Sequence, residues 1–368
     1  MISMNEILAG AVERGASDIL IVAGLPVAYK INGQITREGE RLLPKDTSAL
    51  TEELYDIAMQ AEKRTKDEKS LSRISIDQLH KTGDDDFSFS VPGLSRFRVN
   101  ALRQRGSLGV VIRVVSFQLP DRKALHIPDA IMDFATYSKG LVLITGAAGS
   151  GKSTTLACII DAINNSRSAH IITIEDPIEY LHQHKKSVVV QRELYSDTAT
   201  YDVALRAALR EAPDIILVGE MRDAETIKAT VTAAETGHLV ISTLHTIGAA
   251  NTIDRIIDSF PSEQQQQIRT QLALVLEGVV SQQLIPAVDG ELVPAFEIMK
   301  VNSAARNLIR ESKAHQLDNL ISTSAAQGMI TMDQSLLKLL QQGKITKQQA
   351  LDRSVNYDWM SKRLNLVK

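Results

Sequence analysis

A glycine-rich segment that ends in a lysine and a serine carries the clearest chemical signal in the sequence. Gly146 to Ser153 fits the pattern GxxxxGK[ST], after an apolar run and before a helical stretch. In such a loop, backbone N–H groups converge on phosphate oxygens and the helix N-terminus adds the positive end of its dipole. Lys152 reaches the β and γ oxygens, and Ser153 ligates magnesium. We therefore expect an ATP and Mg²⁺ site whose nucleotide contacts are Gly146, Ala147, Ala148, Gly149, Ser150, Gly151, Lys152, Ser153 and Thr154.

Carboxylates follow two further apolar runs, which are typical of strands in the same sheet. Glu220 comes after one run, with Gly219 where the usual pattern has an aspartate. Because the carboxyl ends of parallel strands face ligands, we expect Glu220 to act on the metal, directly or through water; a solvent-facing glutamate is the alternative. Glu175, Asp176 and Glu179 follow the other run. Without the phosphate loop they would be only an acidic turn, but phosphoryl transfer to water needs an oriented nucleophile.

Two histidines flank the apolar run 239–241. His238 stands at its start and His245 beyond its end, so we expect both near the ligand edge of the sheet. A single histidine is more often structural than catalytic, and no set of metal ligands accompanies this pair.

Four arginines are candidates to bring positive charge to a phosphate. Arg206 and Arg210 are one helical turn apart and so share a face of the helix before the Glu220 strand. Arg98 and Arg113 fall on separate strands near the N-terminus. On sequence alone, all four are also explained as solvated surface charges.

The first third of the chain has the pattern of a small α+β domain. Ser3 and Glu6 form a capping box for a helix that ends at Gly15. Asn32-Gly33 favours a tight hairpin turn. The expected strands are 19–22, 27–31, 34–36, 87–91, 96–102 and 108–115, and helical spacing runs from 47 to about 81. We assign 1–117 to this domain, with an antiparallel sheet, and 118–128 to a linker.

Beyond the linker, the pattern changes to that of an α/β domain. The apolar runs 141–144, 171–174, 215–218 and 239–241 alternate with helical stretches. This alternation indicates βαβ units and a parallel sheet. From about residue 262 the pattern is mostly helical, with a pair of strands at 279–284 and 292–298. The second domain is therefore 129–368, with a helical C-terminal region.

Composition limits the class of protein. The chain has 368 residues, 44% of them apolar and 4% aromatic, as expected of cores made of Ile, Leu, Val and Ala. A net charge of -3 argues against nucleic acid as the main partner. The single cysteine, Cys158, excludes an intramolecular disulfide framework and a zinc site of several thiolates. Because no apolar run is long enough to span a bilayer, we expect a cytoplasmic protein that reaches a membrane only through a partner.

Four stretches, taken together, resemble the secretion-superfamily ATPases and most closely the pilus-retraction ATPases. They are the phosphate loop, Ile174 to Tyr180 (the family's Asp box), Gly219 to Asp223 (its Walker B) and Thr236 to Thr246 (its His box). The resemblance covers nearly the whole chain. It implies a PAS-like N-terminal domain, a RecA-like C-terminal domain and a ring of six subunits.

The resemblance also implies roles for the candidate residues. Glu179 would orient the attacking water, with Glu220 in reserve for that role. His238 and His245 would sense the γ-phosphate or contact a neighbouring subunit. Arg98, Arg113, Arg206 and Arg210 would bring charge to the nucleotide from the N-terminal domain or from a neighbouring subunit, as arginine fingers do.

One segment favours retraction over the other branches of the superfamily. Residues 304–311 resemble the motif AIRNLIRE of retraction ATPases, with Ala305 where that family has isoleucine. An amphipathic helix alone would explain its apolar residues. Assembly and type II secretion relatives generally carry a four-cysteine zinc insertion, which a chain with one cysteine cannot build. They also tend to have long N-terminal domains, whereas 145 residues precede the loop here.

The resulting hypothesis is a hexameric, ATP-hydrolysing motor that retracts a type IV pilus. ATP would close the N-terminal domain of one subunit on the C-terminal domain of another, with the linker as hinge, and turn an inner-membrane platform protein. The alternatives are a pilus assembly or type II secretion ATPase, a DNA-translocating RecA-like motor, and a nucleotide-gated ring without turnover.

Overall fold

The computed structural model describes residues 2–31, 33–65, 74–115, 119 and 121–366. The chain divides into two compact units, Met1–Gln118 and Leu119–Lys368. The boundaries expected from the sequence, 117 and 129, remain predictions, and residues 118 and 120 of the expected linker lie outside the described residues.

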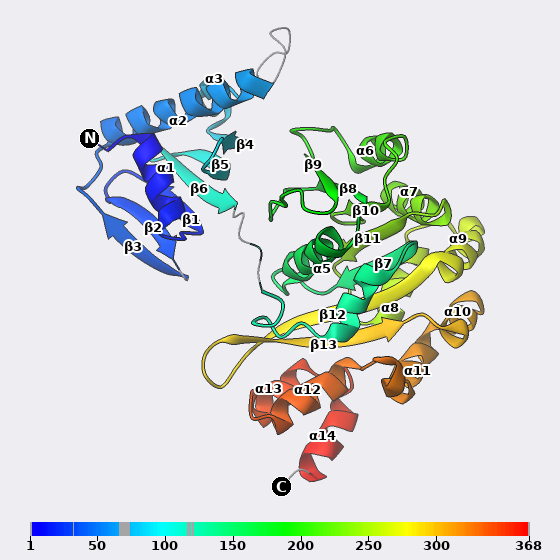
Figure 1. Cartoon of the computed structure of the whole chain (residues 1–368). Coiled ribbons are helices and arrows are strands. Elements are labelled where there is room, and N and C mark those ends of the chain that lie inside the picture. The colour runs from blue at the N-terminus through cyan, green and yellow to red at the C-terminus, as the bar shows by residue number, and fades with distance from the viewer. Residues whose placement is uncertain (1, 32, 66–73, 116–118, 120, 367–368) are drawn as a thin grey trace. The chain divides into compact units, whose positions relative to one another are not determined.

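The first unit is an antiparallel sheet of six strands with helices against it (Figure 1). The strand order is β3-β2-β1-β6-β5-β4, and neighbouring strands are antiparallel. The strands are β1 (Asp18–Ile21), β2 (Val27–Ile31), β3 (Gln34–Glu38), β4 (Asp84–Val91), β5 (Ser95–Gln104) and β6 (Ser107–Val115). The helices are α1 (Met4–Glu13), α2 (Pro44–Thr65) and α3 (Ile76–Thr82). The expected α+β unit is confirmed.

Local signals in the first unit act as the sequence suggests. The Ser3 backbone N–H donates to Glu6 Oε2 at 2.8 Å, and the Glu6 N–H donates to Ser3 Oγ at 3.3 Å, which confirms the capping box. Ile31 pairs with Gln34 across the β2–β3 hairpin, and Gly33 has a φ of +79°. Asn32, the other residue expected in that turn, lies outside the described residues.

The second unit has a seven-stranded sheet that is parallel except at one edge. The strand order is β13-β12-β7-β11-β10-β8-β9, and only β12 and β13 pair antiparallel. The strands are β7 (Gly140–Thr145), β8 (His170–Glu175), β9 (Val188–Glu193), β10 (Ile215–Val218), β11 (Leu239–Leu244), β12 (Leu276–Pro286) and β13 (Leu292–Lys300). The predicted parallel sheet is confirmed. β9 was not predicted, and β12 and β13 are longer than expected.

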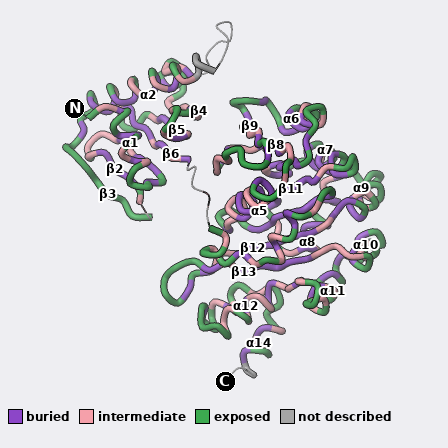
Figure 2. Tube along the Cα trace, in the orientation of Figure 1, coloured by how far each residue is buried: buried purple, intermediate pink, exposed green. Residues whose placement is uncertain are grey.

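Helices cover both faces of this sheet (Figures 1 and 2). Alternate residues of β7 point to opposite layers: Val142 and Ile144 pack with α5, and Leu141 and Leu143 pack with the other layer. The first layer contains α4 (Asp129–Met132), η1 (Asp133–Thr136) and α5 (Lys152–Ser166). The second contains α6 (Tyr201–Ala208), α7 (Ala224–Glu235), α8 (Ala249–Asp258), α9 (Ser262–Val275), α10 (Ser303–Arg310), η2 (Ala314–Gln316) and α11 (Leu317–Thr323). Burial on both faces explains why these strands are continuous apolar runs.

The remaining C-terminal helices pack on the β12–β13 edge. They are α12 (Met332–Gln341), α13 (Lys347–Arg353) and α14 (Tyr357–Leu366), and the short η3 (Ala325–Gln327) precedes them. Ile285 of β12 shares a core with Met332, Leu336 and Met360 of these helices. Glu297 of β13 is 4% exposed and caps two helices, because its carboxylate accepts the N–H of Ala249 at 2.8 Å and of Met332 at 3.3 Å.

Within the segment 304–311, one arginine is part of the fold. Arg306 of α10 donates from Nη1 to the carbonyl oxygens of Ala273 and Leu274 at 2.9 and 2.8 Å. Its Nη2 pairs with Glu277 at 2.8 Å. Arg306 thus satisfies carbonyls at the C-terminus of α9, which backbone hydrogen bonds within the helix leave open. Ala305 is fully buried.

Candidate active site

The glycine-rich loop lies at the carboxyl end of β7 and leads into α5. Gly151, the residue before that helix, has a φ of +87°, which an L side chain rarely adopts. A Cβ at Gly146 would overlap the backbone carbonyl of Gln282 on β12, and one at Gly151 would lie 2.8 Å from the Gln282 side-chain amide. Thr155 in the first turn of α5 donates to Gln282 Oε1 at 2.8 Å. Close packing against β12 therefore requires glycine at both positions.

The ammonium group of Lys152 lies inside this loop. Nζ donates to the carbonyl oxygens of Gly146 at 2.8 Å and Ala147 at 2.9 Å. Burial lowers the pKa of Lys152, and the carboxylates of Glu220 and Glu179 oppose that shift. A lysine at the N-terminus of a helix, beside a converging set of N–H groups, is chemically suited to hold phosphate oxygens.

The candidate acids reach the same cavity as the loop. A pocket of about 530 Å³ is lined by Lys152 and Ser153 together with Glu175, Glu179 and Glu220. The register explains this for two of the acids, because Val218 of β10 pairs with Ile174 of β8, and Glu175 and Glu220 follow within two residues. Glu179 lies on the connection that leaves β8 at the same end. The parallel strands therefore end at one edge, as expected.

The three carboxylates differ in their surroundings. Burial raises the pKa of Glu175 to about 7, although Thr173 and Gln191 donate hydrogen bonds to it. Glu220 is 9% exposed; its carboxylate is paired with Arg222 and lies 3.2 Å from His245 Nε2. Glu179 is exposed, and no described residue forms a hydrogen bond or an ion pair with its carboxylate. Of these acids, Glu179 is the one whose carboxylate is open to a water molecule.

The two histidines lie at opposite ends of the same strand, β11. His245 follows β11 and lines the cavity. His238 precedes β11: its carbonyl accepts the N–H of Gly140 at the start of β7, and its Nδ1 lies 2.9 Å from the Ala233 carbonyl oxygen. The expectation that both histidines lie near the ligand edge is therefore wrong for His238, because a residue before a parallel strand lies at the amino edge.

Arg206 and Arg210 do not line the cavity formed by the described residues of their own unit. Arg206 is an exposed residue of α6 that pairs with Asp202 at 2.9 Å. Arg210 lies in the turn after α6, which ends at Ala208, so the expectation of a shared helix face is wrong. In the first unit, Arg98 and Arg113 are exposed and directly opposite each other on β5 and β6.

Two site residues were not singled out from the sequence. Arg222 pairs with Glu220 and lies 3.8 Å from a carboxylate oxygen of Asp176. The sequence offered one indication of this pairing, because Arg222 lies only two residues after Glu220. Tyr201 lines the cavity, and its buried hydroxyl has no hydrogen-bond partner among the described residues. Burial raises the pKa of this hydroxyl, so it remains a donor at neutral pH. No pattern in the sequence pointed to it.

A second pocket, of about 550 Å³, adjoins the first. Gly151, Thr154 and Leu284 line both pockets. Its other walls are the segment 124–127, which precedes α4, and the 287–294 turn between β12 and β13. The first pocket contains the phosphate loop with Lys152, and the second adds the apolar side chains of Leu125, Ile127 and Val293.

Comparison with known proteins places this arrangement among secretion proteins. The model of the family described as Type II/IV secretion system protein matches residues 1–312. The chain is 44% identical over 351 residues to the type IV pilus retraction ATPase PilT of Pseudomonas aeruginosa, which covers 95% of this chain and 98% of PilT. It is 49% identical over 277 residues to a twitching motility protein of Neisseria gonorrhoeae, covering 75% and 74% of the two chains. A crystal structure of the pilus retraction motor PilT with bound ADP superposes with a TM-score of 0.85 at 44% identity, covering 98% of this chain and 100% of that one.

Proposed function

This chain belongs to the type II/IV secretion system protein family and is an ATPase of that family, and we propose that it is the ATP-driven retraction motor of a type IV pilus. The proposal rests on one observation. The phosphate loop, Glu179 and Glu220 line the same cavity. The relatives favour retraction over assembly, because the relative named as a retraction ATPase matches this chain along nearly its whole length.

The cavity fits a nucleotide phosphate with its metal. Among the described residues there is no cluster of three or more His, Cys, Asp or Glu side chains suited to a metal ion. Magnesium does not need one, because it is held by one or two protein oxygens, substrate phosphates and water. Ser153 and Glu220 line the cavity and offer a hydroxyl and a carboxylate, which are the hard oxygen donors that magnesium prefers. When bound, the ion would offset phosphate charge.

In our proposal, the protein positions the phosphates and orients the water. Lys152 and the loop N–H groups hold the β and γ phosphates, with Tyr201 as a further donor at the cavity wall. Glu179 accepts the proton of the attacking water, since Arg222 and His245 already engage Glu220. Glu220 would then help to hold magnesium, and His245, which contacts the Glu220 carboxylate, would transmit a change at that carboxylate to the loop after β11.

The second pocket accounts for the rest of the nucleotide. Phosphates placed on the loop at Gly151 direct the sugar and base toward Thr154 and Leu284, where the two pockets meet. Leu125, Ile127 and Val293 give that pocket apolar surface for the flat face of a base. ATP would thus be held between α5, the segment before α4 and the β12–β13 turn.

The family resemblance of the sequence implies a ring, and we include that ring in the proposal. We propose a ring of six chains in which Arg98 and Arg113 of one chain, or Arg206 and Arg210, contribute charge to the nucleotide of a neighbour. His238, at the amino edge of the sheet, is assigned to a subunit contact. No helix among the described residues is long and apolar enough to cross a membrane. We also propose that the ring acts at the inner face of the cell membrane by binding a platform protein of the pilus.

The test is the substitution Lys152→Ala in the full-length protein. It removes the cavity's ammonium group, and we expect ATP hydrolysis to fall by about a hundredfold or more, since positive charge on the γ-phosphate stabilises the transition state. Lys139→Ala is the control, because Lys139 is an exposed lysine immediately before β7, at the opposite edge of the sheet. Wild-type turnover in Lys152→Ala would refute the site.

The retraction role is tested in cells. Deleting the gene should leave abundant surface pili and abolish twitching, and Lys152→Ala should fail to restore motility. Bald cells would show instead that the chain drives pilus assembly.

A further inference from the structure

The residue proposed as base lies on an unusual connection. Residues 176–187 join the parallel strands β8 and β9 without a helix. Parallel strands are usually connected through a helix, and a loop of this length without secondary structure is most often functional. Glu179 lies on this connection, so whatever fixes the loop also fixes the distance from Glu179 to the phosphate loop.

The outgoing part of the connection is held by two neighbouring elements. The Ile178 N–H donates to Glu193 Oε2 at 3.1 Å. The Tyr180 carbonyl accepts from Gln191 Nε2 at 2.9 Å, and the Tyr180 hydroxyl lies 3.0 Å from Thr154 Oγ1. Glu179 therefore stands between two anchored residues, and one of the anchors is in the first turn of α5.

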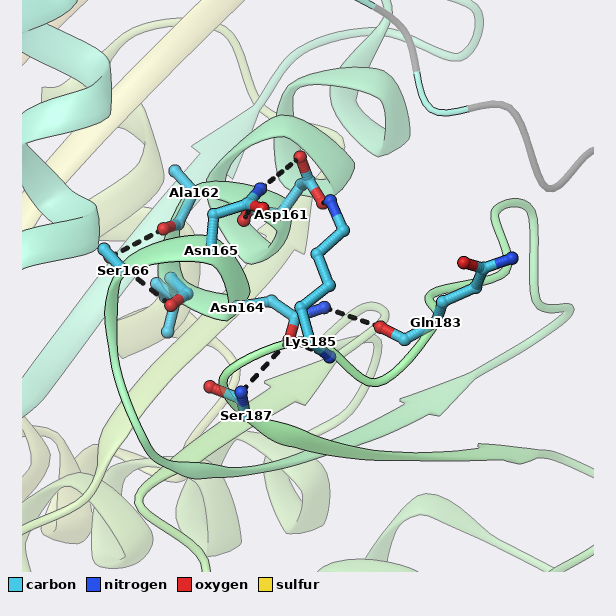
Figure 3. A network of polar contacts seen from close by, with 9 residues as sticks. Asp161, Ala162, Asn164, Asn165, Ser166, Gln183, Lys185 and Ser187 are labelled. Atoms are coloured by element: carbon cyan, nitrogen blue, oxygen red, sulfur yellow. Dashed lines mark hydrogen bonds and ion pairs between the residues drawn. The ribbon is translucent and has the colours of Figure 1, made fainter.

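The returning part is held by one buried side chain of the same helix. Asn164 of α5 is fully buried, and its side chain uses both ends of its amide (Figure 3). Its Nδ2 donates to the Gln183 carbonyl at 2.7 Å. Its Oδ1 accepts the N–H groups of Lys185 at 3.1 Å and Ser187 at 3.3 Å. The backbone carbonyl of Asn164 accepts the Lys186 N–H at 3.0 Å.

Contacts on either side of Asn164 strengthen the same attachment. Lys185 Nζ pairs with Asp161 Oδ1, one turn earlier in α5, at 2.6 Å. Ser187 Oγ donates to the Arg167 carbonyl, just beyond the helix, at 2.7 Å. The returning segment 183–187 is thus bound along the C-terminal end of the helix whose N-terminus receives the phosphates (Figure 3).

We propose that Asn164 is a positioning residue for ATP hydrolysis, which acts by fixing the 176–187 connection so that Glu179 stands at the right distance from the phosphate loop. The inference rests on the proposed function, because it assigns Asn164 to the reaction of that site. Helix α5 holds the nucleotide-binding residues and both ends of the connection in a fixed relation. Its first residues hold the nucleotide, Thr154 holds the loop beside Glu179, and Asn164 holds the loop on its return. Asn164 itself does not line the cavity.

Only an amide of this size satisfies the site. Loop backbone presents one acceptor and two donors to this side chain, and neutral Asn offers the complementary donor and acceptor. Alanine leaves those buried groups without partners, and aspartate loses the donor to Gln183. Unpaired buried polar groups are unfavourable, so the returning segment would move to find water.

The neighbouring residue provides a matched control. Asn165 is exposed, and its Nδ2 bonds only to the carbonyl and carboxylate of Asp161 within α5. Asn165→Ala therefore removes a side-chain amide from the same helix turn that makes no direct hydrogen bond to the connection among the described residues, and Asp161 keeps its own ion pair with Lys185 (Figure 3).

The experiment compares the full-length wild type, Asn164→Ala and Asn165→Ala in steady-state ATP hydrolysis and in backbone hydrogen exchange. We expect Asn164→Ala to lower kcat by about tenfold to a hundredfold with the KM for ATP within about threefold of wild type, since small misplacements of a reacting group have that effect. Amides of 183–187 should lose protection in the same variant. Asn165→Ala should match the wild type in both measurements.

The proposal is overturned if Asn164→Ala keeps the wild-type kcat, or if KM rises in step with the loss of rate. Where Asn164→Ala does not fold, Asn164→Asp keeps the size and the acceptor and answers the same question. A wild type without ATP hydrolysis would refute the proposed function instead. Hydrogen exchange of the backbone amides of 183–187, compared between the wild type and Asn164→Ala, would then still decide whether Asn164 holds the connection.

Discussion

Glu297 gives the second unit a pH dependence that can be measured directly. The pKa of Glu297 is raised from 4.5 to about 7, chiefly by burial and also by the carboxylates of Asp318 and Asp333, while the N–H groups of Ala249 and Met332 oppose the shift. The folded chain therefore holds this proton more tightly than the unfolded chain. The resulting stabilisation is complete below pH 4.5 and is lost as the pH rises through about 7.

The size of the effect follows from the two pKa values. Between pH 5 and 8 this one group should remove roughly 2 to 3 kcal/mol of unfolding free energy. For a unit of this size, that corresponds to a fall in melting temperature on the order of 5 to 10 °C. Glu297→Gln remains neutral at every pH, so its melting temperature should fall less over that range than the wild type's.

The assay is thermal unfolding of the full chain at pH 5, 6, 7 and 8, followed by circular dichroism. Only the difference between the proteins is interpreted, because burial also raises the pKa of Glu175 to about 7. Glu291→Gln, at an exposed position before β13, is the control and should follow the wild type. Parallel curves for Glu297→Gln and the wild type would refute the reasoning.

Two further pairs of substitutions separate roles that the structure distinguishes. Glu179→Gln should lower single-turnover ATP hydrolysis by about 10² to 10⁴ while ATP still binds, as loss of a general base does; Glu220→Gln should instead raise the magnesium concentration needed for half-maximal rate. The assignments would be reversed by two results together: Glu179→Gln keeps the wild-type rate, and Glu220→Gln loses turnover with no change in magnesium dependence. Glu220 would then be the base. Arg306→Ala removes the charged cap of α9 and should lower stability by roughly 2 to 3 kcal/mol. Arg310→Ala alters an exposed end of α10 and should leave the melting temperature unchanged; equal losses would contradict the assignment.

The parts of the fold that could be predicted are those whose surroundings leave a local pattern. Strands buried on both faces must be apolar throughout, so the runs 141–144 and 239–241 were recognisable. β9 was missed because Val188–Glu193 lies at the edge of the sheet and half of it is polar. The pairing of β12 with β7 joins segments more than a hundred residues apart, and no local pattern encodes it.

The same distinction applies to the site. The phosphate loop and Glu220 were accessible because a strand delivers its next residue to a known edge. The placement of His238 could have been corrected from chain direction alone, since it precedes its strand. The pairing of Arg222 with Glu220 had a local signal, because only one residue separates them. Asn164 could not be recognised as a partner of the 176–187 connection, because its contacts are set by tertiary packing.

The contact between the phosphate loop and β12 has a mechanical consequence. Gln282 touches Gly146 and Gly151, and three residues further along the same strand Ile285 enters the core shared with α12 and α14. At about 3.3 Å per residue, roughly 10 Å of strand separates them. Because one continuous strand spans this distance, a displacement of the phosphate loop would be carried by β12 to the C-terminal helices. The C-terminal helices therefore lie close to the phosphate loop along β12, and a partner bound to them would be close to the site of ATP hydrolysis.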